Sequence, residues 1–264
     1  MFLEVGTWTA HIQIDAPLSA PAGDVVLLHS LGTTLHVWDP QTAVLARRLR
    51  VIRPDLRGHG LSEVTKGPYT IEGLAQDVLA LLEAMDVKRV HVVGLSIGGL
   101  IAQAMALLAP QRVASLTLCD TALVIPPPAN WHARARLVRE QGMEAVAETV
   151  LARWVSPAHR ATPEGRGLRQ MLLRTDPEGY AAAAEAIAAA DFTEKTPQLH
   201  LPAHVIVGER DESTPPAAAE ALARALGAKL TVIPGAAHIP NFEHANAFSD
   251  AIEAFLGTLQ DSSR

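Results

Sequence analysis

Short apolar runs alternate along this chain with longer segments whose apolar residues recur at helical spacing. Continuous apolar runs of about five residues are typical of strands buried on both faces. Such runs occupy residues 25–29, 51–55, 90–95, 113–119, 204–208 and 230–233. Helical spacing is clearest from 71 to 85, where Thr70 fits an N-cap, and it recurs at 39–45, 97–109, 216–226 and from about 243 to 259. Residues 2–14 fit a hairpin of edge strands.

This alternation predicts an α/β fold with a mostly parallel central sheet and helices on both faces. The rhythm breaks between residues 125 and 197, where no strand pattern appears and helical segments are expected at 131–140, 143–154, 164–174 and 178–190. We therefore expect a core formed by 1–124 and 198–264, and an inserted helical cap formed by 125–197. Such a cap belongs above the carboxyl ends of the strands, where open α/β sheets bind ligands.

Composition narrows the class of protein. The 264 residues fit one domain of α/β size, 48% of them are hydrophobic, 19% are charged and the net charge is −6, so no basic excess points to nucleic acid. The first residues lack a signal-peptide pattern and no apolar run is long enough to span a membrane, which predicts a cytoplasmic protein with small-molecule partners. The single cysteine, Cys119, is expected to pack as a small hydrophobe.

The sequence Gly94-Leu95-Ser96-Ile97-Gly98 lies where an apolar strand pattern passes into a small-residue helix pattern. A GxSxG motif in that context predicts a nucleophile elbow, in which a sharp, strained turn exposes the serine hydroxyl. The glycines have no Cβ, so the strand and the helix can approach closely on both sides of Ser96. Ser96 is therefore the candidate nucleophile.

A serine hydroxyl needs a base and an acid that orients the base. Asp211 follows the run at 204–208, and His238 follows the run at 230–233, so both fall in loops at the carboxyl ends of strands. The order Ser96, Asp211, His238 is that of α/β hydrolases. Asp120, directly after the run at 113–119, is a rival acid; we expect Asp211 to serve, and Asp120 to occupy a turn or a supporting position.

Attack on a carbonyl also needs donors for the developing oxyanion. The backbone N–H of Ile97 is one candidate, and the N–H of Leu31, in the loop after the first buried strand, is the second. His29 and His59 lie in loops near the expected pocket, where packing explains them as well as catalysis does. No HExxH motif or cysteine and histidine cluster is present, so we predict no metal site.

With these features in place, the whole chain resembles the α/β-hydrolase superfamily and, more narrowly, the 3-oxoadipate enol-lactonases. The narrower resemblance lies in the segments His29–Thr34 with Trp38-Asp39, Asp55–Gly60, Gly67–Ile71, Gly94–Leu100, Leu118–Ala122 and Trp131–Arg134. The resemblance implies hydrolysis of an enol-lactone to 3-oxoadipate in aromatic catabolism, through an acyl-enzyme on Ser96 and without a cofactor. The partner it implies is a small acidic lactone or ester.

A substrate of this kind carries a free carboxylate, which requires a cationic or hydrogen-bonding partner. Arg134, beside Trp131 in the expected cap, is the candidate, although a solvated helix arginine among Arg136 and Arg139 fits the sequence equally well. The chain departs from the family pattern at 179–192, where alanines replace an expected Arg-Asp pair. That segment bears on which substrate fits rather than on the reaction type.

Two other functions are compatible with the sequence. The first is a related carboxylesterase, or a hydrolase of carbon–carbon bonds in small oxoacids. The second is a protein of a different class, which keeps the fold to bind a ligand without catalysis. The serine, aspartate and histidine in the expected order argue against this second function.

Overall fold

The computed structural model describes residues 1–261, with side chains as far as Leu259. Within these residues, eight strands form one sheet, and their order across the sheet is β1-β2-β4-β3-β5-β6-β7-β8. The pairs β1–β2 and β2–β4 are antiparallel and all the others are parallel. The strands are β1 (Phe2–Val5), β2 (Trp8–Asp15), β3 (Asp24–Leu28), β4 (Arg50–Pro54), β5 (Val90–Leu95), β6 (Val113–Cys119), β7 (Ala203–Gly208) and β8 (Lys229–Ile233).

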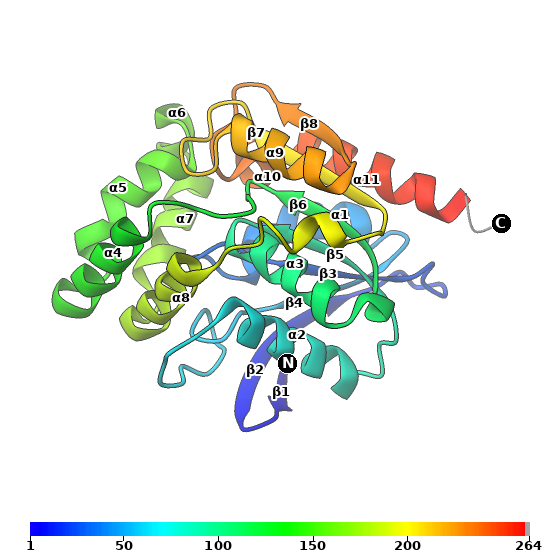
Figure 1. Ribbon diagram of the computed structural model, residues 1–264, viewed down its shortest axis with the longest axis horizontal. Helices are drawn as coiled ribbons and strands as arrows, with labels where there is room; N and C mark the ends of the chain where they lie inside the picture. Colours follow the sequence, from blue (N-terminus) through cyan, green and yellow to red (C-terminus); the bar gives the residue numbers. More distant parts are fainter. Residues whose placement is uncertain (262–264) are drawn as a thin grey trace.

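Helices cover both faces of this sheet, which confirms the predicted α/β architecture (Figure 1). One face carries α2 (Ile71–Ala84), α3 (Ile97–Leu108) and α9 (Pro216–Leu226). The other carries α1 (Asp39–Leu45) and α11 (Ala245–Asp261), which contact each other. The 3₁₀ turns η1 (Leu35–Trp38), η2 (Pro110–Arg112) and η3 (Thr196–Gln198) complete the connections.

Residues 125–197 contain no strand in the described structure and form five helices between β6 and β7. Figure 1 shows them gathered at one end of the sheet, where α4 packs along α8. We call 125–197 the helical segment. Its helices are α4 (Pro128–Gln141), α5 (Glu144–Trp154), α6 (Pro157–Arg160), α7 (Pro163–Leu173) and α8 (Pro177–Ala189).

Several element boundaries differ from the expectations, and proline accounts for most of the differences. Pro128 occupies the first turn of α4, so this helix begins three residues before the expected start at Trp131. The short helix α6 was not expected; Ser156 caps it and Pro157 opens it. Likewise Pro240 opens a separate helix, α10 (Pro240–Glu243), so that α11 begins at Ala245 instead of about Glu243.

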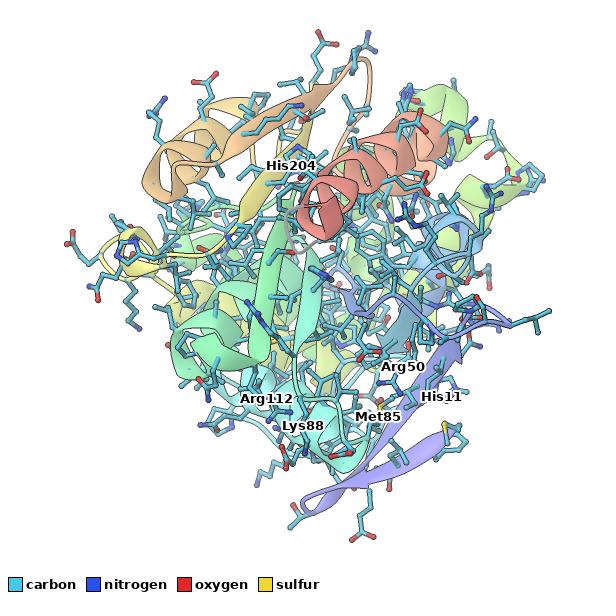
Figure 2. All side chains as sticks on the ribbon, turned by 90° about the vertical axis from the view of Figure 1, so that its right-hand side faces the viewer. His11, Arg50, Met85, Lys88, Arg112 and His204 are labelled. Atoms are coloured by element: carbon cyan, nitrogen blue, oxygen red, sulfur yellow. The ribbon has the colours of Figure 1, made fainter. Side chains whose placement is uncertain are left out.

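Hydrogen bonds and a ring contact fix several elements of the core in place. Thr70 caps α2 as expected, because its hydroxyl accepts the Gly73 N–H at 2.9 Å. Arg112 donates to Glu83 and to the Val87 carbonyl and thereby ties the end of α2 to the start of β6. Figure 2 shows Arg112 at the lower end of the sheet and His204 beside α11, where its ring packs against Phe255. Cys119 is fully buried, as predicted.

No helix among residues 1–261 is both long and apolar enough to cross a membrane.

Candidate active site

Ser96 lies at the junction of β5 and α3 in the strained backbone that the motif predicts. Its φ of 57° and ψ of −115° lie outside the conformations that most residues adopt. The flanking glycines are required by contact: a Cβ on Gly94 would lie 2.2 Å from the Gly98 carbonyl oxygen, and a Cβ on Gly98 would lie 2.3 Å from the Leu28 oxygen. The elbow therefore packs backbone against backbone on both sides of Ser96.

Asp211 and His238 are joined by a hydrogen bond of 2.8 Å between the carboxylate Oδ2 and the ring Nδ1. Both side chains are buried. Burial alone would raise the pKa of the Asp211 carboxyl, but the charge and hydrogen bond of His238 and the hydrogen bonds from Thr214 outweigh burial and lower it. Asp211 is thus an anion that binds Nδ1 of His238. The other ring nitrogen, Nε2, takes no part in this hydrogen bond.

Thr214 also supports this pair, which the sequence analysis did not anticipate. Its hydroxyl donates to Asp211 Oδ2 at 2.7 Å and lies 3.4 Å from His238 Nδ1. The backbone N–H groups of Ser213 and Thr214 donate to Asp211 Oδ1. An aspartate followed by serine and threonine at the second and third positions favours such a turn, so the sequence Asp211–Thr214 carried a usable signal.

Ser96 and His238 line one cavity beneath the helical segment, although they lie far apart in the sequence. The cavity holds about 30 Å³, and Ser96 is only 5% exposed. Side chains from the sheet edge and from four helices or their flanking loops form its walls: Ser30, Leu31, Ile125, Trp131, Arg134, Val150, Arg153, Trp154, Tyr180, Ser213 and Thr214. Ser96, His238 and the helical segment therefore meet at the carboxyl ends of the parallel strands.

The loop after β3 brings Leu31 to this cavity, next to Ser96 and the start of α3 at Ile97. His29 supports the loop from behind: its Nδ1 donates to the Ser30 carbonyl at 2.8 Å, and its Nε2 accepts the Leu56 N–H. Burial lowers the pKa of His29, and burial together with His29 lowers that of His59 to about 3. Both rings are neutral and buried, which fits a packing role.

Asp120, the rival acid, lies beside the pair at the end of β6. Its φ is +44°, its Oδ1 accepts the Gly208 N–H at 2.8 Å, and Oδ2 has no hydrogen-bond partner among the described residues. Burial and the charge of Asp211 raise the pKa of the Asp120 carboxyl well above its usual range. The surroundings of Asp120 thus favour its neutral form, whereas those of Asp211 favour the anion.

Asp120, Asp211 and His238 also offer three ligand atoms within 4.8 Å of one another, close enough for a metal ion. The donor set fits a metal poorly. Asp211 Oδ2 already accepts hydrogen bonds from His238 and Thr214, and burial and the charge of Asp211 raise the pKa of Asp120, which favours its protonated form. A cation here would have to break the hydrogen bond between the histidine and the aspartate.

One wall of the cavity is cationic and aromatic. Arg134 lies over the Trp131 ring at 4.7 Å, within the range of a cation–π contact, and Trp131 is fixed by a hydrogen bond to the Ile125 carbonyl. Arg153 and buried Tyr180 complete this wall. Neither was anticipated, because no motif marks them and only the packing of the helices brings them to Ser96.

Comparison with known proteins identifies the family to which the chain belongs. Residues 24–245 match the family model described as the alpha/beta hydrolase fold. The chain belongs to the α/β-hydrolase family. This α/β hydrolase is 36% identical to "3-oxoadipate enol-lactonase 2" of Acinetobacter baylyi over 234 residues, which cover 88% of each chain.

Solved structures agree with the sequence relatives. The enol-lactonase from Burkholderia xenovorans LB400 superposes with a TM-score of 0.93 at 41% identity, covering 97% of this chain and 100% of that one. A thermophilic esterase from Thermogutta terrifontis superposes with a TM-score of 0.92 at 31% identity, covering 98% and 99%. The resemblance to the enol-lactonases is thus confirmed.

Proposed function

We propose that this α/β hydrolase is a serine hydrolase that opens 3-oxoadipate enol-lactone to 3-oxoadipate through an acyl-enzyme on Ser96. One observation carries the proposal: strained Ser96 and the His238–Asp211 hydrogen-bonded pair meet at one cavity. The enol-lactonase relatives support the choice of substrate.

In the first half of the reaction, Ser96 Oγ attacks the lactone carbonyl and its proton passes to His238 Nε2. Asp211 stabilises the imidazolium through Nδ1. The backbone N–H groups of Leu31 and Ile97 donate to the oxyanion, and losing one such donor typically costs roughly 3 to 4 kcal/mol in barrier height. The carbonyl then re-forms as the ring C–O bond breaks, and the enol oxygen takes the proton from His238. The enol tautomerises to the ketone.

In the second half, His238 removes a proton from water, and the hydroxide attacks the acyl carbon on Ser96. The ester bond to Ser96 breaks, Ser96 Oγ takes the proton back from His238, and the carboxylic acid leaves. These steps balance with water alone, so the proposed reaction uses no cofactor and no metal.

The helical segment acts in this proposal as a cap that closes the substrate cavity. Arg134 pairs with the free carboxylate of the substrate, and Trp131 holds the guanidinium in place through its ring. Changing Arg134 to alanine should raise KM for the acidic lactone and leave KM for neutral esters unchanged. Arg136 is exposed on the same helix and does not line the cavity, so Arg136→Ala is the matched control.

The esterase neighbour favours a second candidate, a carboxylesterase acting on other small esters or a hydrolase of related oxoacids. Hydrolysis of the purified enol-lactone, followed by loss of its ultraviolet absorbance beside a panel of neutral aryl esters, separates the two. A clear preference for the lactone supports the enol-lactonase, and equal or better turnover of the neutral esters overturns it. Labelling of Ser96 by an organophosphonate separates both enzymes from a ligand-binding protein without catalysis.

A further inference from the structure

A second and larger cavity lies on the other side of the loop that carries Leu31. It holds about 280 Å³, and none of its lining residues also lines the cavity at Ser96. Its core wall comes from β2 and the loops after β3 and β4, and its outer wall comes from the C-terminal half of α7. We call it the α7 cavity. Its size approaches that of the pockets that bind small organic molecules.

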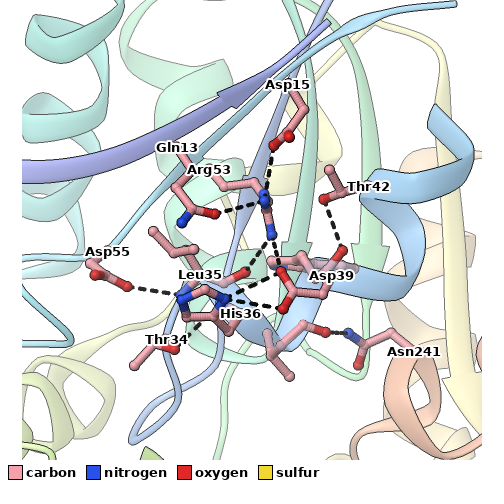
Figure 3. Close-up of polar contacts among 12 residues, drawn as sticks. Gln13, Asp15, Thr34, Leu35, His36, Asp39, Thr42, Arg53, Asp55 and Asn241 are labelled. Carbon is pink, nitrogen blue, oxygen red and sulfur yellow. Dashed lines mark hydrogen bonds and ion pairs between the residues drawn. The ribbon is translucent and has the colours of Figure 1, made fainter. Parts of the chain in front are cut away.

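The core wall of the α7 cavity is held together by hydrogen bonds to one buried carboxylate. Asp55 is buried there, and both carboxylate oxygens are used: Oδ1 accepts the Leu35 N–H at 2.8 Å, and Oδ2 accepts from Leu61 N–H at 3.0 Å and contacts His11 Nδ1 at 2.8 Å. Figure 3 shows the Asp55 carboxylate facing Leu35, with His36 alongside. Both Asp55 oxygens therefore already have hydrogen-bond donors, and the charged donor left for a ligand is Arg174 on the outer wall.

The outer wall supplies free donors. Gln170 and Arg174 are four residues apart and so lie on one side of α7. Neither side chain makes a hydrogen bond or ion pair with the other residues that the structure describes. The carbonyls in this last turn are occupied, since Met171 O accepts from the Thr175 hydroxyl and Gln170 O from the Arg174 N–H, which weakens their repulsion of an anion.

Apolar surface lies next to these donors. Met171 lines the α7 cavity from the helix, and Leu61 lines it from the core although its side chain is 66% exposed. An alkyl group that covered these two side chains would bury apolar surface and so favour binding. A ligand that satisfies both features has an anionic head for Arg174 and Gln170 and a short alkyl stem for Leu61 and Met171.

We propose that the α7 cavity binds a small aliphatic carboxylate, with its head on the Arg174 guanidinium and its stem against Leu61 and Met171. The planar guanidinium matches a carboxylate with two parallel hydrogen bonds. The proposal concerns a site separate from Ser96 and does not depend on the reaction there.

This site contacts the loop of the candidate oxyanion hole. Thr175 lines the α7 cavity, and its hydroxyl shares its one proton between the Met171 carbonyl at 3.0 Å and the Gly32 carbonyl at 3.3 Å, one residue after Leu31. Gly32 in turn is packed so tightly that a Cβ would lie 2.7 Å from Leu172 and 2.9 Å from Tyr180, which lines the Ser96 cavity. A carboxylate bound to α7 would therefore hold the helical segment against this loop.

Calorimetric titration with hexanoate tests the proposal, with hexanamide as the neutral control of the same shape. Each titration is run on the unlabelled protein and on protein whose Ser96 cavity is blocked with an organophosphonate, so that binding near Ser96 is separated from binding at α7. Arg174→Gln is the test variant. Arg166→Gln is its control, because Arg166 is exposed on the same helix and does not line the cavity.

We expect the blocked protein to bind hexanoate at one saturable site and hexanamide at least about ten-fold more weakly. Arg174→Gln should weaken hexanoate binding by about ten-fold or more, and Arg166→Gln should leave it unchanged. Three results overturn the proposal: no saturable binding to the blocked protein, equal binding of acid and amide, or equal effects of the two substitutions.

Discussion

Two neighbouring carboxyl groups at the candidate active site have pKa values shifted in opposite directions, and their surroundings explain why. Asp211 receives hydrogen bonds from His238, Thr214 and two backbone N–H groups, which favour the anion. Asp120 receives one N–H and faces the charge of Asp211, which favours the acid. The order of the residues in the sequence favoured Asp211, and the larger number of donors around its carboxyl gives a physical reason for the same choice.

The first prediction concerns which carboxylate supports His238. Asp211→Asn should lower turnover by about 10³- to 10⁴-fold, because an amide no longer holds the imidazole in its working tautomer. Asp120→Asn should retain most of the activity, since its Oδ1 can still accept the Gly208 N–H. Steady-state kinetics on both variants decides, and a collapse of turnover in Asp120→Asn alone would reverse the assignment.

The second prediction uses the raised pKa of Asp120. The folded protein keeps this proton while the unfolded chain releases it above about pH 4, so rising pH favours unfolding by up to about 1.4 kcal/mol per pH unit until the folded pKa is reached. Asp120→Asn has no such proton. Denaturant titrations between pH 5 and pH 8 should show that the wild type loses stability relative to the variant as the pH rises. If the free energy of unfolding depends on pH in the same way in both proteins, the raised pKa of Asp120 is contradicted.

At the scale of elements, the nucleophile elbow shows what a sequence can and cannot reveal. The glycines at 94 and 98 predicted a close approach of strand and helix, and the contacts of Gly98 with β3 agree. The buried strands were predictable because a short, continuous apolar run is typical of a strand that is covered on both faces. The short helices α6 and α10 were not, because four residues carry no helical period and only a proline and a cap mark them.

The third prediction tests the packing of the elbow. Gly98→Ala should destabilise the protein by about 1–3 kcal/mol, because the new Cβ would lie 2.3 Å from a backbone oxygen that cannot move without shifting β3. Gly257→Ala in α11 is the control: its Cβ meets nothing within 4 Å, and alanine should stabilise that helix by about 0.5–1 kcal/mol. Chemical denaturation measures both, and equal effects would refute the close approach.

At the scale of the whole molecule, helices remote in sequence complete the cavity over Ser96. The sequence predicted the candidate nucleophile, acid and base because each follows a strand in a recognisable order. It did not predict Arg153 or Tyr180 as wall residues, since their position depends on how α5 and α8 pack over the sheet. Tertiary packing of this kind leaves no pattern along the chain.

The fourth prediction follows from the size of that cavity. A volume of about 30 Å³ has room for one or two water molecules, so a lactone reaches Ser96 only when the helical segment moves away from the core. The α4 helix buries few side chains, and its ion pairs from Arg139 to Glu178 and Glu185 join it to α8 within the helical segment and not to the core. Hydrogen exchange should therefore be faster in α4 than in the buried helix α3, and equal protection would argue against opening.

The central claim is that Ser96 performs the chemistry in concert with His238 and Asp211. Its most direct test is hydrolysis of purified 3-oxoadipate enol-lactone by the wild type and by Ser96→Ala, with circular dichroism to show that both are folded. The account predicts a loss of turnover of about 10³-fold or more in the variant. A folded Ser96→Ala protein that opens the lactone at the wild-type rate would contradict it.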